Sequence, residues 1–151
     1  MIDQRVPDIA LPATNAQTIR LPALRGKIVV LYFYPKDNTP GCTNETRDFG
    51  ALYPQFDAAG AVVLGVSRDS LKSHESFKAK LELPFELLSD TEEIACQAFD
   101  VIRMKNMYGK QVRGIERSTF AIDREGVVRR EWRKVKVDGH AQEVLHFVHS
   151  L

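Results

Sequence analysis

The chain contains two cysteines, Cys42 and Cys96, and their number and spacing limit the chemistry they can do. They lie too far apart in the sequence to form a CxxC dithiol or a zinc-knuckle pattern. A chain with at most one disulfide is also unlike the small secreted domains that depend on several. The chemistry that remains is that of a single reactive thiol acting as a nucleophile.

Cys42 has the local sequence of a reactive thiol. Thr39, Pro40 and Gly41 precede it, and Thr is favoured as a helix N-cap while Pro is favoured as the first helical residue. Cys42 is therefore expected in the first helical turn, where unpaired backbone N–H groups and the positive end of the helix dipole favour the thiolate. A small apolar helix residue, which describes most free cysteines, is the weaker interpretation.

Apolar patterning indicates the elements that must hold Cys42 in place. Residues 27–34, which are apolar after Lys27, and residues 61–66 form continuous runs typical of strands that are covered on both faces. Residues 70–81 predict a polar, weakly amphipathic helix. A longer helix after Cys42 is indicated by apolar residues at helical spacing, namely Phe49, Leu52, Tyr53 and Phe56.

The second half of the chain predicts smaller elements. We expect an extended piece at residues 85–88, a short helix at 91–99, and a hairpin formed by 118–122 and 127–132. A last helix begins after Asp138 as its cap and carries four apolar residues on one face, Ala141, Val144, Leu145 and Val148.

This order of elements predicts an α/β fold with a central mixed β-sheet flanked by helices on both faces. Residues 18–21 add a small edge strand. A thioredoxin-like fold fits this order well, and periodicity alone leaves a flavodoxin-like one open. The 151 residues contain no repeat, low-complexity tract or Gly/Ser linker, so we expect a single domain over residues 1–151.

Charge and hydropathy exclude several partners. Lys and Arg number 21 against 20 Asp and Glu, and a net charge of +1 gives no basic excess for nucleic acid or anionic membranes. The longest apolar run, residues 28–34, is far short of the roughly 20 residues that span a bilayer. The N-terminus has no positive start followed by an apolar stretch, so no secretory signal is visible and a cytoplasmic protein is expected.

Three histidines near the C-terminus, His140, His146 and His149, give no clear metal site. The last two are one helical turn apart, which suits metal ligation, but no third ligand is apparent. We expect all three to be solvated helix residues, and we expect no cofactor.

The segment around Cys42 resembles a known active site. Pro35-x-x-x-Thr39-x-x-Cys42 looks like the signature of peroxiredoxins, and the stretch from Phe33 to Thr43 is similar to the bacterioferritin-comigratory, or PrxQ, subfamily. The likeness extends over nearly the whole chain and includes residues 6–8 and 115–123. It implies thiol-dependent reduction of hydrogen peroxide and organic hydroperoxides, without metal or flavin.

The resemblance also implies a role for each matching residue. The Cys42 thiolate attacks a peroxide oxygen and becomes a sulfenic acid, and the Thr39 hydroxyl positions thiolate and peroxide. Pro35 forms one wall of the site and excludes solvent from it. Arg117 stabilises the thiolate and the charge that develops in the transition state. Glu45, three residues after Cys42, holds the Arg117 guanidinium in place.

The chain departs from the family in its second cysteine. Many PrxQ-type proteins carry a resolving cysteine five residues after the first, where this chain has Arg47, and others carry it on the following helix, where residues 70–83 have none. Cys96 has apolar neighbours and is expected to be a buried, inert thiol. We therefore expect a one-cysteine mechanism with an external thiol reductant, namely thioredoxin, glutaredoxin or glutathione, in a monomer or weak dimer.

Two other functions of Cys42 stay open at this stage. Monothiol disulfide exchange of the glutaredoxin type uses the same fold, although the proline usual before the third sheet strand is absent and Arg117-Ser118 stands there. A non-enzymatic redox-sensing or binding module would use the same thiol without turnover. A cysteine-type phosphatase is disfavoured, because it needs a loop Cys-x5-Arg and this chain has one residue fewer between Cys42 and Arg47.

Overall fold

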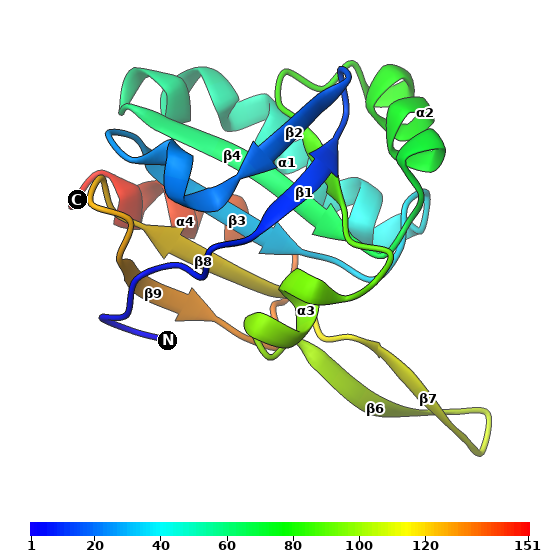
Figure 1. The fold of residues 1–151 in the computed structure, drawn as a ribbon. Coiled ribbons are helices and arrows are strands. Elements are labelled where there is room, and N and C mark those ends of the chain that lie inside the picture. Colours follow the sequence, from blue (N-terminus) through cyan, green and yellow to red (C-terminus); the bar gives the residue numbers. More distant parts are fainter.

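The computed structural model describes residues 1–151 and folds them around a seven-stranded sheet in the order β2-β1-β5-β4-β3-β8-β9 (Figure 1). Strands β3, β4 and β5 are parallel to one another, whereas the outer strands pair antiparallel. The predicted central mixed sheet is therefore confirmed. The strands of this sheet are β1 (Ala10–Ala13), β2 (Gln17–Arg20), β3 (Ile28–Phe33), β4 (Ala61–Ser67), β5 (Leu87–Ser89), β8 (Ser118–Ile122) and β9 (Val128–Trp132).

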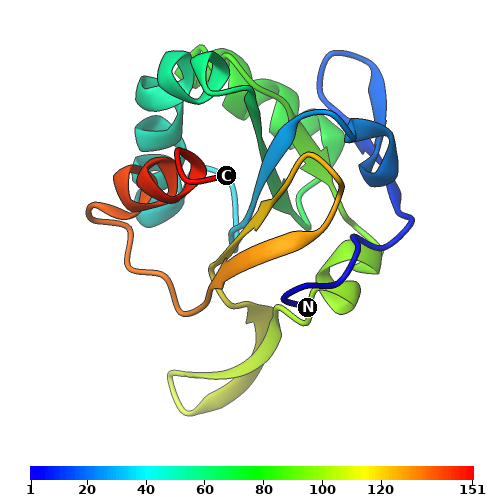
Figure 2. The same cartoon turned by 90° about the vertical axis from the view of Figure 1, so that its left-hand side faces the viewer.

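Helices cover both faces of the sheet, as predicted. Figure 2 shows α1 and α4 on one side and the short α3 on the other. The helices are α1 (Pro40–Ala58), α2 (Leu71–Leu81), α3 (Ile94–Ala98) and α4 (His140–Val148), with a 3-10 turn η1 (Leu21–Leu24). No helix is both long enough and apolar enough to cross a membrane.

Strand β3 divides the interior into two apolar clusters. All six of its residues are buried, because both faces of the sheet are covered. Ile28, Val30 and Tyr32 point to the cluster that contains Cys42 and side chains of α1, α2 and α4. The alternate residues of β3 point to the opposite cluster, which contains Cys96 and other side chains around α3. The sheet thus separates the two cysteines.

The predicted elements agree with the structure to within a few residues, and the predicted edge strand is β2. Three strands were not predicted: β1 and the ribbon formed by β6 (Ile102–Met107) and β7 (Lys110–Ile115). The ribbon projects away from the sheet, so most of its side chains are exposed and it lacks an apolar alternation (Figure 1).

Two expectations about α4 were wrong. Its N-cap is Gly139 rather than Asp138, because the chain enters the helix through a left-handed backbone conformation, φ +74°, that suits glycine. His140 is not solvated: it lies one turn before Val144 on the buried face, and its Nε2 is 2.8 Å from Thr119 Oγ1. His146 and His149 are exposed, as expected.

Candidate active site

The loop between β3 and α1 places Cys42 at a helix N-terminus. Thr39 has the extended backbone of an N-cap (φ −82°, ψ 151°), and Pro40 is the first helical residue. Cys42 follows in the first turn, as the sequence predicted, and only 1% of it is exposed. Its sulfur lies where unpaired backbone N–H groups favour negative charge.

Arg117, immediately before β8, connects Cys42 with Glu45. One guanidinium nitrogen, Nη2, donates to Cys42 Sγ at 3.3 Å, and the other, Nη1, donates to Glu45 Oε1 at 2.7 Å. Burial alone would lower the pKa of Arg117, but the attraction of Glu45 and Cys42 raises it above its ordinary value. The guanidinium therefore brings a fixed positive charge to the sulfur.

Gly41 gives the guanidinium room. A Cβ atom at this position would lie 3.3 Å from Arg117 Nη2, which is tighter than ordinary packing. The glycine before Cys42 thus permits the close approach of Arg117 to the first turn of α1.

Glu45 is a carboxyl group in the protein interior. It is 1% exposed, and its second oxygen, Oε2, has no hydrogen-bond partner. Burial raises the pKa of Glu45 to about 7, against the opposing effect of Arg117. Glu45 therefore changes its charge near neutral pH while it holds the guanidinium.

This arrangement is built for a charged thiol. A helix N-terminus and a guanidinium both stabilise a thiolate, which is the nucleophilic form of cysteine. The same donors stabilise negative charge that develops on an oxygen bonded near the sulfur.

Comparison with known proteins agrees with this chemistry. The family model described as AhpC/TSA family matches residues 2–131. The chain belongs to this family. Among its relatives, Peroxiredoxin Bcp of Xanthomonas campestris is 59% identical over 138 residues, which cover 91% of this chain and 86% of the relative. Peroxiredoxin Bcp of Bacillus subtilis is 50% identical over 144 residues, covering 95% and 92% of the two chains.

Solved structures give the same assignment. Bacterioferritin comigratory protein of X. campestris, described for its alkyl peroxide reduction activity, matches with a TM-score of 0.91 and 56% identity over 95% of this chain and 91% of that chain. A PrxQ variant from Xylella fastidiosa matches with a TM-score of 0.94 and 46% identity over 99% and 96%. The chain is therefore a peroxiredoxin of the Bcp or PrxQ type, a thiol-dependent peroxidase with a thioredoxin-like fold.

Thr39 and Pro35 lie in the loop of this peroxiredoxin, outside the hydrogen-bonded group of Cys42, Arg117 and Glu45. The Thr39 hydroxyl donates to the Lys36 carbonyl oxygen at 2.8 Å and makes no side-chain cap of α1. Its oxygen keeps lone pairs that can accept a further hydrogen bond. Pro35 is half-buried and lies two residues after the end of β3, in the same loop.

Cys96 has the surroundings of an inert thiol. It is fully buried in α3, and burial, together with the nearby Asp90, raises the pKa of its thiol far above the ordinary value. Its backbone N–H donates to Asp90 Oδ2 at 2.7 Å. The expectation that Cys96 is buried is confirmed.

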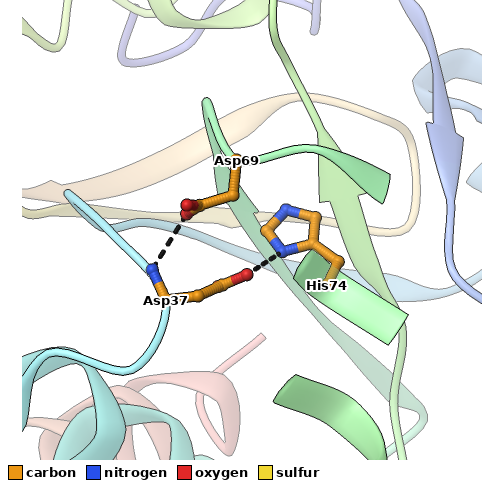
Figure 3. Close-up of side chains that lie close together, drawn as sticks. All are labelled: Asp37, Asp69 and His74. Carbon is orange, nitrogen blue, oxygen red and sulfur yellow. Dashed lines mark hydrogen bonds and ion pairs between the residues drawn. The ribbon is translucent and has the colours of Figure 1, made fainter. Parts of the chain in front are cut away.

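Two charged groups near the site were not predicted. Lys105, on β6, donates to the Ile115 carbonyl oxygen at 2.7 Å, and burial and the charge of Arg117 lower its pKa. Asp37 is buried in the loop before α1 and contacts His74 of α2 (Figure 3). Helical spacing could have predicted the burial of His74, because it lies three residues before Phe77 on the same face of α2.

Proposed function

We propose that this peroxiredoxin reduces hydrogen peroxide and organic hydroperoxides through a one-cysteine cycle in which Cys42 is the nucleophile. The observation that carries the proposal is the fork of Arg117, which binds Cys42 Sγ and Glu45 together at the N-terminus of α1. Its relatives act as thiol-dependent peroxidases, and the X. campestris protein is described for alkyl peroxide reduction.

In the first step the Cys42 thiolate attacks one peroxide oxygen. The S–O bond forms as the O–O bond breaks, and the departing oxygen takes a proton to leave as water or an alcohol. Sulfur is oxidised to the sulfenic acid and the peroxide is reduced. Arg117 stabilises the charge that moves from sulfur to the departing oxygen, and Glu45 holds Arg117 in place.

Thr39 and Pro35 complete the site in this proposal. The Thr39 hydroxyl, which already donates to Lys36, accepts a hydrogen bond from the protonated peroxide oxygen and so orients the O–O bond for in-line displacement. Pro35 limits the access of water from the side of β3.

In the second half of the cycle an external thiol attacks the sulfenic acid and releases water. A second thiol then attacks the external sulfur of the mixed disulfide, forms a disulfide with the first thiol and releases the Cys42 thiolate. This second half is favoured because the sheet separates Cys42 from Cys96. The two positions where PrxQ-type proteins carry a resolving cysteine also lack one, since the first is Arg47 and α2 contains no cysteine. Thioredoxin, glutaredoxin and glutathione are the candidate reductants, which fits a single-domain monomer or weak dimer in the reducing cytoplasm.

Peroxide consumption with dithiothreitol tests the cycle. We expect Cys42→Ser to be inactive, Cys96→Ser to turn over like the wild type, and one equivalent of peroxide to leave a sulfenic acid on Cys42 in the mass spectrum. A stoichiometric Cys42–Cys96 disulfide would overturn the one-cysteine version. Consumption of one equivalent without turnover would instead identify a redox sensor.

A further inference from the structure

A buried carboxylate lies in the loop that leads to Cys42. Asp37 is 4% exposed, although its neighbours Lys36 and Asn38 are exposed. A charged group is stable in the interior only when it is paired and hydrogen-bonded. The partners of Asp37 therefore show what holds this loop.

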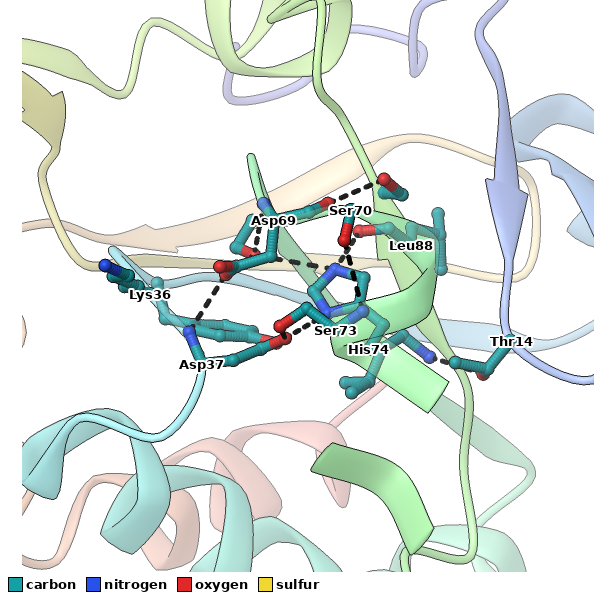
Figure 4. A network of polar contacts seen from close by, with 12 residues as sticks. Thr14, Lys36, Asp37, Asp69, Ser70, Ser73, His74 and Leu88 are labelled. Carbon is teal, nitrogen blue, oxygen red and sulfur yellow. Dashed lines mark hydrogen bonds and ion pairs between the residues drawn. The ribbon is translucent and has the colours of Figure 1, made fainter. Parts of the chain in front are cut away.

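Four hydrogen bonds surround Asp37 (Figure 4). The Tyr34 hydroxyl donates to Oδ1 at 2.6 Å, and the Ser73 hydroxyl donates to Oδ2 at 2.8 Å. His74 Nδ1 lies 2.8 Å from the same Oδ2 (Figure 3). The backbone N–H of Asp37 donates to Asp69 Oδ2 at 2.9 Å. Burial alone would raise the pKa of Asp37, but the hydrogen bond and charge of His74 bring it below its ordinary value.

The second ring nitrogen of His74 contacts strand β5. Nε2 is 2.9 Å from the carbonyl oxygen of Leu88, which only accepts hydrogen bonds, so Nε2 carries a hydrogen. Nδ1 faces Oδ2 of Asp37, so the imidazole bridges Asp37 and β5. The side chains of His74 and Asp37 are 0% and 1% exposed, which makes this a contact of the protein interior.

The same residues resemble a metal site, but their donor atoms are occupied. Asp37, Asp69 and His74 place possible ligand atoms within 4.8 Å of one another. Asp69 Oδ2 accepts from Asp37 N–H and from Ser67 Oγ, and both nitrogens of His74 are hydrogen-bonded. A cation would have to displace these hydrogen bonds, so a hydrogen-bonded network accounts for the cluster better than a metal does.

The contact between Asp37 and His74 acts on the loop that leads into α1. Asn38, which follows Asp37, has a φ of +65°, a left-handed conformation that Asn adopts more readily than most non-glycine residues and that turns the chain sharply here. Thr39 comes next and bonds back to Lys36. Because α2 holds Asp37 through Ser73 and His74, the position of α2 sets the course of the chain into α1.

We propose that His74 is a positioning residue for peroxide reduction: its hydrogen bond with Asp37 clamps the loop of residues 34–39 onto α2 and so aligns Thr39 with Cys42. The proposal rests on the proposed function of Cys42. In-line attack on a peroxide depends on this alignment, whereas alkylation of the same thiol by iodoacetamide does not use Thr39. The ratio of the two rates therefore reports alignment separately from thiol reactivity.

The test compares the second-order rate constants of Cys42 with hydrogen peroxide and with iodoacetamide in the His74→Gln variant of the full chain. We expect the peroxide rate to fall at least tenfold while the iodoacetamide rate is maintained or rises. His146→Gln, an exposed histidine on α4, is the matched control and should change neither rate. A folded His74→Gln variant with an unchanged ratio would overturn the proposal.

Asp37→Asn provides a second variant if His74→Gln does not fold. The amide is isosteric with the carboxylate but has only one acceptor oxygen, so the contacts of Tyr34 with Oδ1 and of Ser73 and His74 with Oδ2 cannot all be kept. The same loss of peroxide rate at constant alkylation is expected, and an unchanged ratio contradicts the clamp. A failure of the proposed function gives a different result from a failure of the clamp. If Cys42 were not the nucleophile, Cys42→Ser would retain peroxidase turnover.

Discussion

The guanidinium of Arg117 lies 3.3 Å from the sulfur of Cys42, although the two residues are 75 positions apart in the sequence. The contact joins the residue immediately before β8 to the first turn of α1 and gives the thiol a positive neighbour that cannot lose its proton. A preorganised donor of this kind stabilises charge in the transition state at no cost of reorganisation.

Replacement of Arg117 should therefore slow the reaction with peroxide. For Arg117→Met we expect kcat/KM for hydrogen peroxide to fall by about 10²–10³-fold, which is typical for loss of one such donor. Competition for peroxide with a second peroxidase measures this value. Arg47→Met is the control, because Arg47 is exposed on α1 and should change the rate less than about twofold. Equal effects of the two variants would remove Arg117 from the mechanism.

Glu45 and His140 should act on stability with opposite signs as pH changes. Burial raises the pKa of Glu45 from 4.5 to about 7, so the folded chain binds more protons than the unfolded chain between these values and its free energy of unfolding falls as pH rises. Burial lowers the pKa of His140 from 6.5 to about 4, so the unfolded chain binds more protons between those values and the free energy of unfolding rises with pH.

The two effects overlap between about pH 4.5 and 6.5 and partly cancel in the wild type. Glu45→Gln should reveal the rise due to His140, and His140→Asn should reveal the fall due to Glu45, each on the order of 3 kcal/mol over its full range. Urea denaturation at a series of pH values measures both slopes. Parallel curves for the wild type and Glu45→Gln would show that Glu45 is already ionised across this range.

The sequence was sufficient for the position of Cys42 but not for the contacts around it. Thr39 and Pro40 mark the start of α1 through local backbone preferences, and the buried runs mark β3 and β4 through hydropathy alone. No local pattern joins Arg117 to Glu45, 72 residues away, and only the family resemblance suggested that pair. The Asp37–His74 pair was missed because its two members lie in different elements that meet only in the fold.

Gly41→Ala should separate stability from catalysis. Alanine favours a helix over glycine by about 1 kcal/mol, but the new Cβ would lie 3.3 Å from Arg117 Nη2 and push the guanidinium away from the sulfur. We expect thermal stability to be maintained or raised while the peroxide rate falls about 3- to 10-fold. Stopped-flow measurement of sulfenic acid formation and a thermal melt report the two quantities.

Gly50→Ala on the same helix is the control for Gly41→Ala. Its Cβ would meet Leu83 Cδ2 at 3.6 Å and Pro84 Cδ at 3.8 Å, which is ordinary contact far from Arg117. This variant should gain stability and keep the wild-type peroxide rate. If Gly41→Ala behaved in the same way, the space left by Gly41 would have no role in placing Arg117.

Cys96 should stay unreactive as long as the chain is folded. It is fully buried on the opposite side of the sheet from Cys42, and its thiol has a raised pKa, so the thiolate needed for reaction is scarce. We expect a disulfide reagent such as dithionitrobenzoate to label Cys42 in the native protein and Cys96 only after denaturation. Cys96→Ala should leave the peroxide rate and the thioredoxin-supported turnover unchanged. A loss of thioredoxin-supported turnover, with dithiothreitol-supported turnover intact, would instead show that α3 opens during the cycle and that Cys96 resolves the sulfenic acid.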